Sequence, residues 1–366
     1  MKTFKFSLLA LTATVLITAC SNEEIALQPA NSSEPQGISF RMQGGTPEIT
    51  TRTTATTLPY LDAFVVYGSD NVHKDALIFE GTTVALDINE SDPVNGDFIF
   101  TYAPTKYYDA KASKGYFIAF SPVSAKFDHD ETKVPAFVTG TGQIAATFQY
   151  TVPTPDKTGK GYTAQEDLLI ARKVVDGVGT PKTMASTVVH LEFEHALSRI
   201  FVTARNNTKD PVVIKSLTLR NLAQTGKLEF EITDYDWYWT PDFTPANLQD
   251  YKYILADSGV VVAPMASTVA PIYVTTKEQG MMVLPQKTVN KGKVDELNET
   301  ATDKDFALEY EYTFANLGLQ KRLILLPDEY PFEVGKQYTI NLVFDGTAVE
   351  FTVDVNEFAT PVLANP

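Results

Sequence analysis

The stretch Val188-Val-His-Leu-Glu-Phe-Glu-His-Ala-Leu-Ser-Arg-Ile-Phe-Val-Thr-Ala204 lies near the middle of the chain and decides its fold. Apolar and charged residues alternate in its first half, which predicts a β-strand with the odd-numbered residues from Leu191 to Leu197 on one face. The apolar phase then slips by one residue and continues at Ile200. Such a slip turns a strand over unless a bulge or a tight turn absorbs it. We therefore expect a kink at 197–199, with Leu197 and Ile200 both buried.

The composition favours strands over helices and gives the chain an acidic balance. The chain has 17 Tyr and 22 Phe among its 366 residues, and aromatic residues are enriched in strands. A length of 366 residues also favours two domains over one. The formal net charge is −15, from 30 basic and 45 acidic residues. We expect no nucleic-acid partner, because such a surface has no excess of cations to displace counterions from phosphate.

The N-terminus is organised like a lipoprotein signal peptide over residues 1–19. Lys2 and Lys5 give a positive start, and the apolar run that follows is too short to span a membrane. Ile17-Thr-Ala-Cys20 then resembles the bacterial lipobox, in which the cysteine is acylated. Cys20 is the single cysteine of the chain, so internal disulfides are excluded. We expect a lipid on Cys20 that anchors the protein in the outer membrane; an ordinary secretory peptide is the alternative.

Residues 20–37 form a polar stretch with no pattern of burial, and we expect a disordered tether there. Its early Glu23-Glu24 pair resembles the acidic mark that directs lipoproteins of Bacteroidetes-type bacteria to the cell surface. The pattern therefore favours a surface-exposed protein held by its N-terminus.

The rest of the chain consists of short strand-like segments separated by turn residues, and few segments have sustained helical periodicity. We therefore predict an all-β fold of two tandem β-sandwich domains. The stretch 180–186 is the most linker-like. This places an N-terminal domain at 38–185 and a C-terminal domain at 186–366.

Four short motifs follow the lipobox in a fixed order: Glu166-Asp-Leu-Leu-Ile-Ala171, Leu191-x-Phe193-x-His195-Ala-Leu-Ser-Arg-Ile200, Met282-Val-Leu-Pro-Gln286 and Phe332-x-x-Gly335-Lys-x-Tyr338. This series resembles the fimbrillin (Mfa-like) family, the lipoprotein precursors of type V pilus subunits of Bacteroidetes-type bacteria. The resemblance covers most of the mature chain.

This resemblance implies sandwiches of transthyretin-like topology and a stalk, tip or anchor subunit of a pilus (fimbrium) that contributes to cell adhesion. It also implies export as a lipoprotein and cleavage by an arginine-specific protease. The cut removes the lipid and a first strand, and it leaves a groove for a neighbour's strand. The expected partners are other pilus subunits, that protease, the outer membrane and a host protein or glycan.

The residues that such a strand exchange needs are present near the N-terminus. Ile38 and Phe40 alternate with polar residues between glycines, which suits a short plug strand. Arg52 lies among small residues in a stretch open to proteolysis, and the Thr-Arg pair usual for the family falls there. Arg41 is the alternative cleavage site, although it lies inside the expected strand. An ordinary loop arginine at position 52 is the remaining interpretation.

The C-terminus holds the most regular alternation of the chain. Its apolar positions are Val349, Phe351, Val353 and Val355, with Phe358 beyond them. The run is either a donor strand or the last strand of its own domain, and the second interpretation is slightly favoured for 349–355. Residues 356–366 can extend from it as a donor, but their prolines suit a central strand poorly. Where Phe358 stands, the family often has Trp, which leaves the register open.

Catalytic patterns are absent from the sequence, and we expect no enzyme, no cofactor and no metal site. The chain has four histidines, and it contains no Gly-x-Ser-x-Gly, His-Glu-x-x-His or phosphate-loop motif. His195 lies on the apolar face of its strand, where a core role is expected. Trp237 and Trp239 alternate with other residues beside carboxylates, which suits either half-buried core aromatics or stacking on sugar rings. The alternative function is therefore a lipid-anchored surface glycan-binding protein of an outer-membrane uptake system.

Overall fold

The computed structural model describes the larger part of the chain from residue 37 onward. The described residues are 37–43, 61–72, 77–91, 97–125, 127–128, 146–153, 165, 167–178, 187–230, 237–253, 255–256, 258–266, 269–275, 280–287, 306–315, 317–326, 331–345 and 348–357. Cys20, Arg52 and Phe358 lie outside these ranges.

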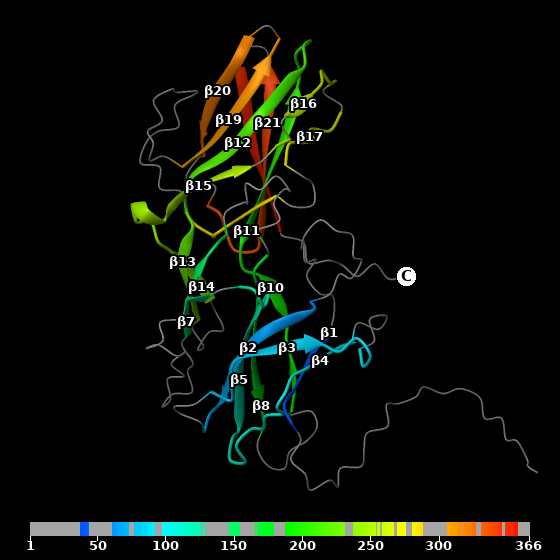
Figure 1. Cartoon of the computed structure of the whole chain (residues 1–366), viewed down its shortest axis with the longest axis vertical. Helices are drawn as coiled ribbons and strands as arrows, with labels where there is room; N and C mark the ends of the chain where they lie inside the picture. Colours follow the sequence, from blue (N-terminus) through cyan, green and yellow to red (C-terminus); the bar gives the residue numbers. More distant parts are fainter. Residues whose placement is uncertain are drawn as a thin grey trace, which may run out of the picture. The chain divides into compact units, whose positions relative to one another are not determined.

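Nearly all of the regular secondary structure in the described residues is β-strand (Figure 1). Its one helical element is the 3₁₀ turn η2 (Pro245–Asn247). The all-β class that the aromatic and alternating sequence predicted is confirmed, with sheets packed face to face. No helix in the described residues is long and apolar enough to cross a membrane.

The first sheet has eight strands in the order β10-β8-β5-β2-β3-β4-β1-β9. All of its pairs are antiparallel except β1 with β9. Its strands are β1 (Ser39–Gln43), β2 (Ala63–Asp70), β3 (Phe79–Leu86), β4 (Asp97–Thr101), β5 (Lys114–Ser121), β8 (Leu169–Asp176), β9 (Val188–His190) and β10 (Phe193–His195).

Strands β5 and β8 are buried on both faces because each lies between two cores. Alternate residues of β5 point to opposite sides, so Phe117 contributes to one apolar cluster and Ile118 to the other. The neighbouring residues Leu169 and Ile170 of β8 divide in the same way. This explains why Tyr-Phe-Ile-Ala-Phe of β5 is continuously apolar instead of alternating.

A second sheet of four strands, in the order β14-β13-β7-β6, covers one of these faces. Its inward side chains, Phe148 and Phe230 among them, pack against Phe120, with ring centroids 4.8 and 5.9 Å away. The strands are β6 (Phe127–Asp128), β7 (Ala146–Thr151), β13 (Thr225–Phe230) and β14 (Trp237–Pro241).

Two five-stranded sheets form a sandwich from the C-terminal part of the chain. One has the order β17-β11-β21-β22 with β18 beside β11, and the other has the order β15-β12-β19-β20 with β16 beside β12. Their strands are β11 (Ser198–Asn206), β12 (Val212–Ala223), β15 (Leu248–Tyr253), β16 (Val260–Val262), β17 (Ile272–Tyr273), β18 (Met281–Val283), β19 (Ala307–Phe314), β20 (Leu317–Leu325), β21 (Lys336–Asp345) and β22 (Ala348–Glu357).

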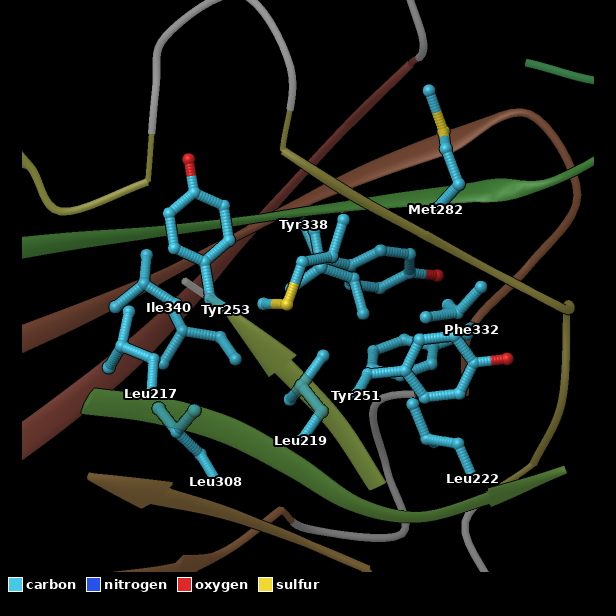
Figure 2. Close-up of a cluster of buried hydrophobic side chains, with 14 of the residues drawn as sticks. Leu217, Leu219, Leu222, Tyr251, Tyr253, Met282, Leu308, Phe332, Tyr338 and Ile340 are labelled. Atoms are coloured by element: carbon cyan, nitrogen blue, oxygen red, sulfur yellow. The ribbon is translucent and has the colours of Figure 1, made fainter. Parts of the chain in front are cut away.

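The core of this sandwich is filled by large aliphatic and aromatic side chains from both sheets. Figure 2 shows Leu217 and Leu219 of β12 with Leu308 of β19 beside Ile340 of β21. The ring of Tyr251, from β15, is fully buried among them. Burial raises the pKa of the Tyr251 hydroxyl, so this ring stays neutral and packs as an aromatic residue.

The central stretch crosses from the first sheet to the C-terminal sandwich. Strand β10 pairs with β8 of the eight-stranded sheet, and β11 pairs with β21 and β18 of another. Between them lie only Ala196 and Leu197. The expected kink is confirmed, because Leu197 and Ile200 are both fully buried although their spacing breaks the alternation.

His195 lies at this crossing and is buried. Its Nδ1 atom is 2.5 Å from Oδ2 of Asp167, and both side chains are nearly inaccessible to solvent. Burying a charged or polar group is favourable only when a partner satisfies it. The residue is therefore a core histidine paired with a carboxylate.

The domain boundary at 185/186 stays a prediction. Three pairings join strands from the two sides of it, namely β1 with β9, β8 with β10 and β7 with β13. The two apolar clusters also share the strands β5 and β8. Any division of the chain into domains therefore has to assign β9 and β10, at 188–195, to the sheet of the N-terminal half.

We predict that Leu197→Ala lowers the free energy of unfolding by about 2–5 kcal/mol, because it opens a cavity where the chain changes sheets. Chemical denaturation followed by tryptophan fluorescence measures this change. Leu317→Ala is the matched control, since Leu317 is 57% exposed, and it should change stability by less than about 0.5 kcal/mol. Equal effects of the two substitutions would contradict the structural role of the crossing.

Candidate functional site

The candidate site is the groove in the eight-stranded sheet that β1 occupies. Strand β1 is antiparallel to β4, with Phe40 opposite Phe100, and parallel to β9, with Phe40 opposite Val189. Backbone hydrogen bonds join Ser39 N to Thr187 O (2.9 Å) and Leu191 N to Arg41 O (3.0 Å). In the described part of the chain β1 is the only strand paired with β9, so removing β1 leaves unpaired backbone on two strands.

The inward face of β1 is completely apolar. Ile38, Phe40 and Met42 are 3%, 0% and 3% exposed, whereas Ser39 and Arg41 on the other face are half-buried. The Phe40 ring lies 5.3–5.8 Å, between centroids, from four other aromatic rings, in mostly edge-to-face geometry: Phe64, Phe79, Tyr102 and Phe117. Burying three such side chains stabilises the fold by roughly 5–9 kcal/mol in total.

Residues 102–106 clasp the N-terminal end of β1. The Tyr102 hydroxyl donates to the carbonyl of Ile38 at 2.6 Å and accepts from Lys106 N at 3.4 Å. Ile38 N donates to Lys106 O at 2.9 Å, and Lys106 Nζ donates to Ile78 O at 2.5 Å while lying over the Phe79 ring. Burial raises the pKa of the Tyr102 hydroxyl, which keeps it a donor. We call residues 102–106 the clasp.

The glycine before β1 fits closely under this clasp. A Cβ atom at Gly37 would lie 2.3 Å from Cγ2 of Thr105, which is shorter than any normal contact between carbon atoms. Any larger residue at position 37, the glycine that flanks the plug strand in the sequence pattern, would therefore have to displace the Thr105 side chain of the clasp.

The two candidate cleavage sites differ in their accessibility to a protease. Arg41 is inside β1, with Ile99 and His190 opposite it on the two neighbouring strands. Its peptide bond therefore enters a protease only after β1 has left the sheet. Arg52 lies outside the described residues, in the segment 44–60 that joins β1 to the rest of the chain. A cut there separates β1 covalently from the sheet that holds it.

The C-terminal run is the outer strand of its own sheet. Strand β22 pairs with β21 from Ala348 to Glu357, over ten residues. Val349 is buried, Phe351 and Val353 pack against the core, and Val355 is 44% exposed. Phe358 and the tail beyond it lie outside the described residues. The other edge of β22 has no partner among the described strands.

The two tryptophans face inward on β14. The Trp239 indole N–H donates to the carbonyl of Ala196 at 2.8 Å, and its ring lies 6.1 Å from that of Tyr150. Trp237 also packs against the apolar core. Their neighbour Tyr238 points to the opposite face, where it is 44% exposed. The geometry therefore gives the indoles a packing role and leaves the outward face of β14 to other residues.

The described residues contain no group of three or more His, Cys, Asp or Glu side chains arranged to hold a metal ion.

Comparison with known families assigns this chain to a class of surface protein. The sequence profile of the fimbrillin-like family matches residues 51–357. The chain therefore belongs to the fimbrillin-like family, as the four motifs indicated. A search of curated protein sequences gives no match.

Solved structures of fimbrial proteins are similar to this chain at low sequence identity. A fimbrial protein from Bacteroides vulgatus ATCC 8482 is 13% identical, with 88% of this chain and 100% of that chain covered and a TM-score of 0.54. The tip fimbrial protein Mfa3 from Porphyromonas gingivalis, with C-terminal truncation, is 7% identical, with 88% and 100% covered and a TM-score of 0.40. The first comparison supports a common fold.

Sequence reasoning identified β1 but missed what holds it. The clasp residues Tyr102 and Lys106 lie in a turn-rich segment with no motif, and their contact with Ile38 spans about sixty residues of sequence. Strand β9 was also expected to continue as one strand with β10, whereas it pairs with β1 and β10 pairs with β8. Only the three-dimensional arrangement brings these segments together.

We predict that Tyr102→Phe loosens β1 without unfolding the sheet. The change removes the hydrogen bond to the Ile38 carbonyl and costs about 0.5–1.5 kcal/mol. Hydrogen–deuterium exchange of a peptide covering 37–43 should become up to about tenfold faster if β1 opens locally. Tyr107→Phe, at a tyrosine that is 44% exposed, serves as the control. Unchanged exchange in Tyr102→Phe would rule out the clasp.

Proposed function

We propose that this chain is a structural subunit of a cell-surface pilus that assembles by strand exchange after proteolytic removal of β1. The observation that carries the proposal is the position of β1. It is a five-residue strand with a fully buried apolar face, and Arg52 lies in the segment that connects it to the remaining sheet. Membership of the fimbrillin-like family supports a pilus role.

In this proposal, cleavage at Arg52 weakens the retention of β1 in the sheet, although the contacts that β1 makes there stay the same. Before the cut, β1 is held to the sheet by the chain itself, and its return after any local opening is intramolecular. After the cut, the fragment that carries Ile38 and Phe40 dissociates into solution, and rebinding depends on its concentration. The rate at which the fragment dissociates then depends on the clasp and on the backbone hydrogen bonds of β1 with β4 and β9.

The emptied groove has a definite specificity for its next occupant. Its walls are the edges of β4 and β9, which require a strand antiparallel to one and parallel to the other. Its floor is the aromatic cluster around Phe64 and Phe117, which requires apolar side chains at alternate positions. A strand from another subunit that meets both conditions restores the ladders and reburies the floor.

The donor that we propose is the segment after β22. Strand β22 is itself paired with β21 over its whole length, so donating it would dismantle its own sheet. The tail from Phe358 to Pro366 follows that strand directly in the sequence, so it can extend to a neighbouring subunit while β22 stays in its sheet. The tail is short and contains two prolines, which suit a central strand poorly, so the part that inserts between β4 and β9 is brief.

Lipid on Cys20 supplies the route to the cell surface in this proposal. The precursor is anchored in the outer membrane by its acylated N-terminus, and the cut by an arginine-specific protease at Arg52 frees the subunit for polymerisation. Stalk, tip and anchor roles are all compatible with this sequence of events, and adhesion to a host protein or glycan follows from surface display.

We expect Arg52→Ala to stay monomeric under conditions where the cut chain polymerises. Treatment of the mature chain with an arginine-specific endoprotease should give a new N-terminus at Thr53 and species of high mass on size-exclusion chromatography. Arg41→Ala is the matched control and should still be cut and still assemble. If the cut chain loses β1 yet remains monomeric at high concentration, the strand-exchange proposal is wrong.

Deleting residues 358–366 tests the donor separately. The cut, truncated chain should have the same thermal unfolding midpoint as the cut full chain but should no longer polymerise by itself. It should still accept the tail of an intact chain, because its own groove is unchanged. Polymerisation at the normal rate would assign the donor to another segment.

Cys20→Ala tests the anchor. Because Cys20 is the single thiol of the chain, the substitution should abolish labelling by a radioactive or alkyne-tagged palmitate analogue and move the precursor out of the membrane fraction. Ser21→Ala is the control and should leave labelling intact. Labelling that persists in Cys20→Ala would exclude the lipobox.

A further inference from the structure

The outward face of the sheet formed by β7, β13 and β14 carries polar side chains arranged in rows. Gln149, Lys227 and Thr240 are cross-strand neighbours at one level of the three strands. All three are exposed, whereas the residues one step along, Phe148 and Leu228, are buried on the opposite face. Figure 1 shows the strands β13 and β14 next to each other beside β7.

A pocket of about 510 Å³ lies over this face, at the end where β14 turns into the loop before η2. Its floor consists of the polar row and Gly226, and its wall is the loop from Pro241 to Thr244. Sites for small ligands have volumes of about 300–1,000 Å³, so the pocket has room for one or two sugar rings.

The loop that forms the wall is held rigidly. Asp242 accepts hydrogen bonds from Thr244 N (2.9 Å) and Asn247 Nδ2 (2.7 Å), and its own N–H donates to Thr225 O (2.9 Å). The bond from the Thr244 backbone N–H is the main reason that the pKa of Asp242 lies below its usual value. Because these contacts fix the loop, the pocket is formed before any ligand binds.

The pocket offers hydrogen-bonding groups that the described protein does not use. Neither the amide of Gln149 nor the ammonium of Lys227 has a hydrogen bond within the described residues. The Thr240 hydroxyl donates to Glu229 at 2.7 Å, which leaves its oxygen as an acceptor. Two donors and an acceptor therefore converge on one open space.

One exposed aromatic ring lines the pocket, and a second lies on the outward face of β14 outside the pocket lining. Phe243, in the wall of the pocket, is 42% exposed, and Tyr238, two residues before Thr240 on β14, is 44% exposed. Residues two apart on a strand lie on the same face about 6.6 Å apart. Exposed rings of this size are costly to leave in water, and their flat faces suit the C–H face of a pyranose.

We propose that this pocket binds a neutral or N-acetylated oligosaccharide. A sugar ring stacked on Phe243 would place its hydroxyls at the side chains of Gln149 and Lys227. The carboxylate of Asp242 beside Lys227 disfavours a polyanionic ligand, and the polar floor disfavours a purely apolar one. The site uses Phe243 of the pocket wall, not the two tryptophans whose rings pack inward.

This inference does not depend on strand exchange. The pocket belongs to the sheet of β7, β13 and β14, and the groove of β1 belongs to the other face of the eight-stranded sheet. Ligand binding by the uncut monomer therefore tests the pocket alone, while assembly of the cut chain tests the pilus role.

The test is a glycan array that contains neutral, N-acetylated and acidic oligosaccharides, probed with the full mature chain. Isothermal titration calorimetry then measures affinity for the array hits and for cellohexaose, maltohexaose, N-acetylchitohexaose and hexagalacturonate. We expect binding to at least one neutral or N-acetylated sugar. Phe243→Ala and Lys227→Ala should each weaken it about tenfold or more, and Gln149→Ala should weaken it in the same direction.

Two controls keep the outcome clear. Tyr107→Ala removes an equally exposed ring outside the pocket and should leave affinity unchanged. Thermal unfolding midpoints within a few degrees of the parent's show that the pocket variants are folded. Absence of any array hit, binding restricted to acidic sugars, or affinity that is unchanged in both Phe243→Ala and Lys227→Ala would each overturn the proposal.

Discussion

Between His195 and Ser198 the chain leaves one sheet and enters another, and most of the architecture depends on that short crossing. Two residues, Ala196 and Leu197, make the transfer, and both are fully buried. The apolar phase of a strand is fixed by its sheet, so a chain that serves two sheets in succession has to change phase where it crosses. The one-residue slip of the apolar pattern after Leu197 is therefore required, because the same continuous chain lines one core before the crossing and another core after it.

The same crossing connects the core to the candidate groove. Strand β9 comes just before it and is paired with β1, while β10 is paired with β8. One segment of the chain therefore supplies β9, which borders the groove, and β10, the other edge strand of the eight-stranded sheet, and it continues directly into β11 of the next sheet. The buried His195–Asp167 pair lies on the β10 side of this segment, and β9, which borders the groove, has only three residues.

Much of this arrangement could be predicted from the sequence, and the reason is local alternation. The alternation of Ile38 and Phe40, the phase slip after Leu197 and the run from Val349 to Val355 each indicate a strand and its buried face. The partners of each strand could not be predicted in this way, because the hydrogen bonds of a sheet join segments that are far apart in the sequence and share no local pattern. That β1 lies between β4 and β9, and that Tyr102 holds Ile38, could not be derived from the order of residues.

The pocket was hidden from sequence analysis for a related reason. The aromatic-acidic cluster around Trp237 and Trp239 was noticed, but alternation does not say which side of β14 faces the core. The core takes the indoles because Trp239 reaches the carbonyl of Ala196 at the crossing, and the outward side then falls to Tyr238 and Thr240. Residues from β7 and β13 complete that side, and β7 (146–151) comes from a part of the chain far from β14 (237–241) in the sequence.

The division between two apolar clusters has a functional consequence. Side chains of β1 contact the cluster that contains Phe64 and Phe117 and make no part of the cluster that contains Phe148 and Leu228. Opening the groove therefore exposes one core while the other stays packed, and the four-stranded sheet keeps its support. In the strand exchange that we propose, β1 would leave without disturbing the face that carries the pocket, so the two proposed activities would not compete for the same stability.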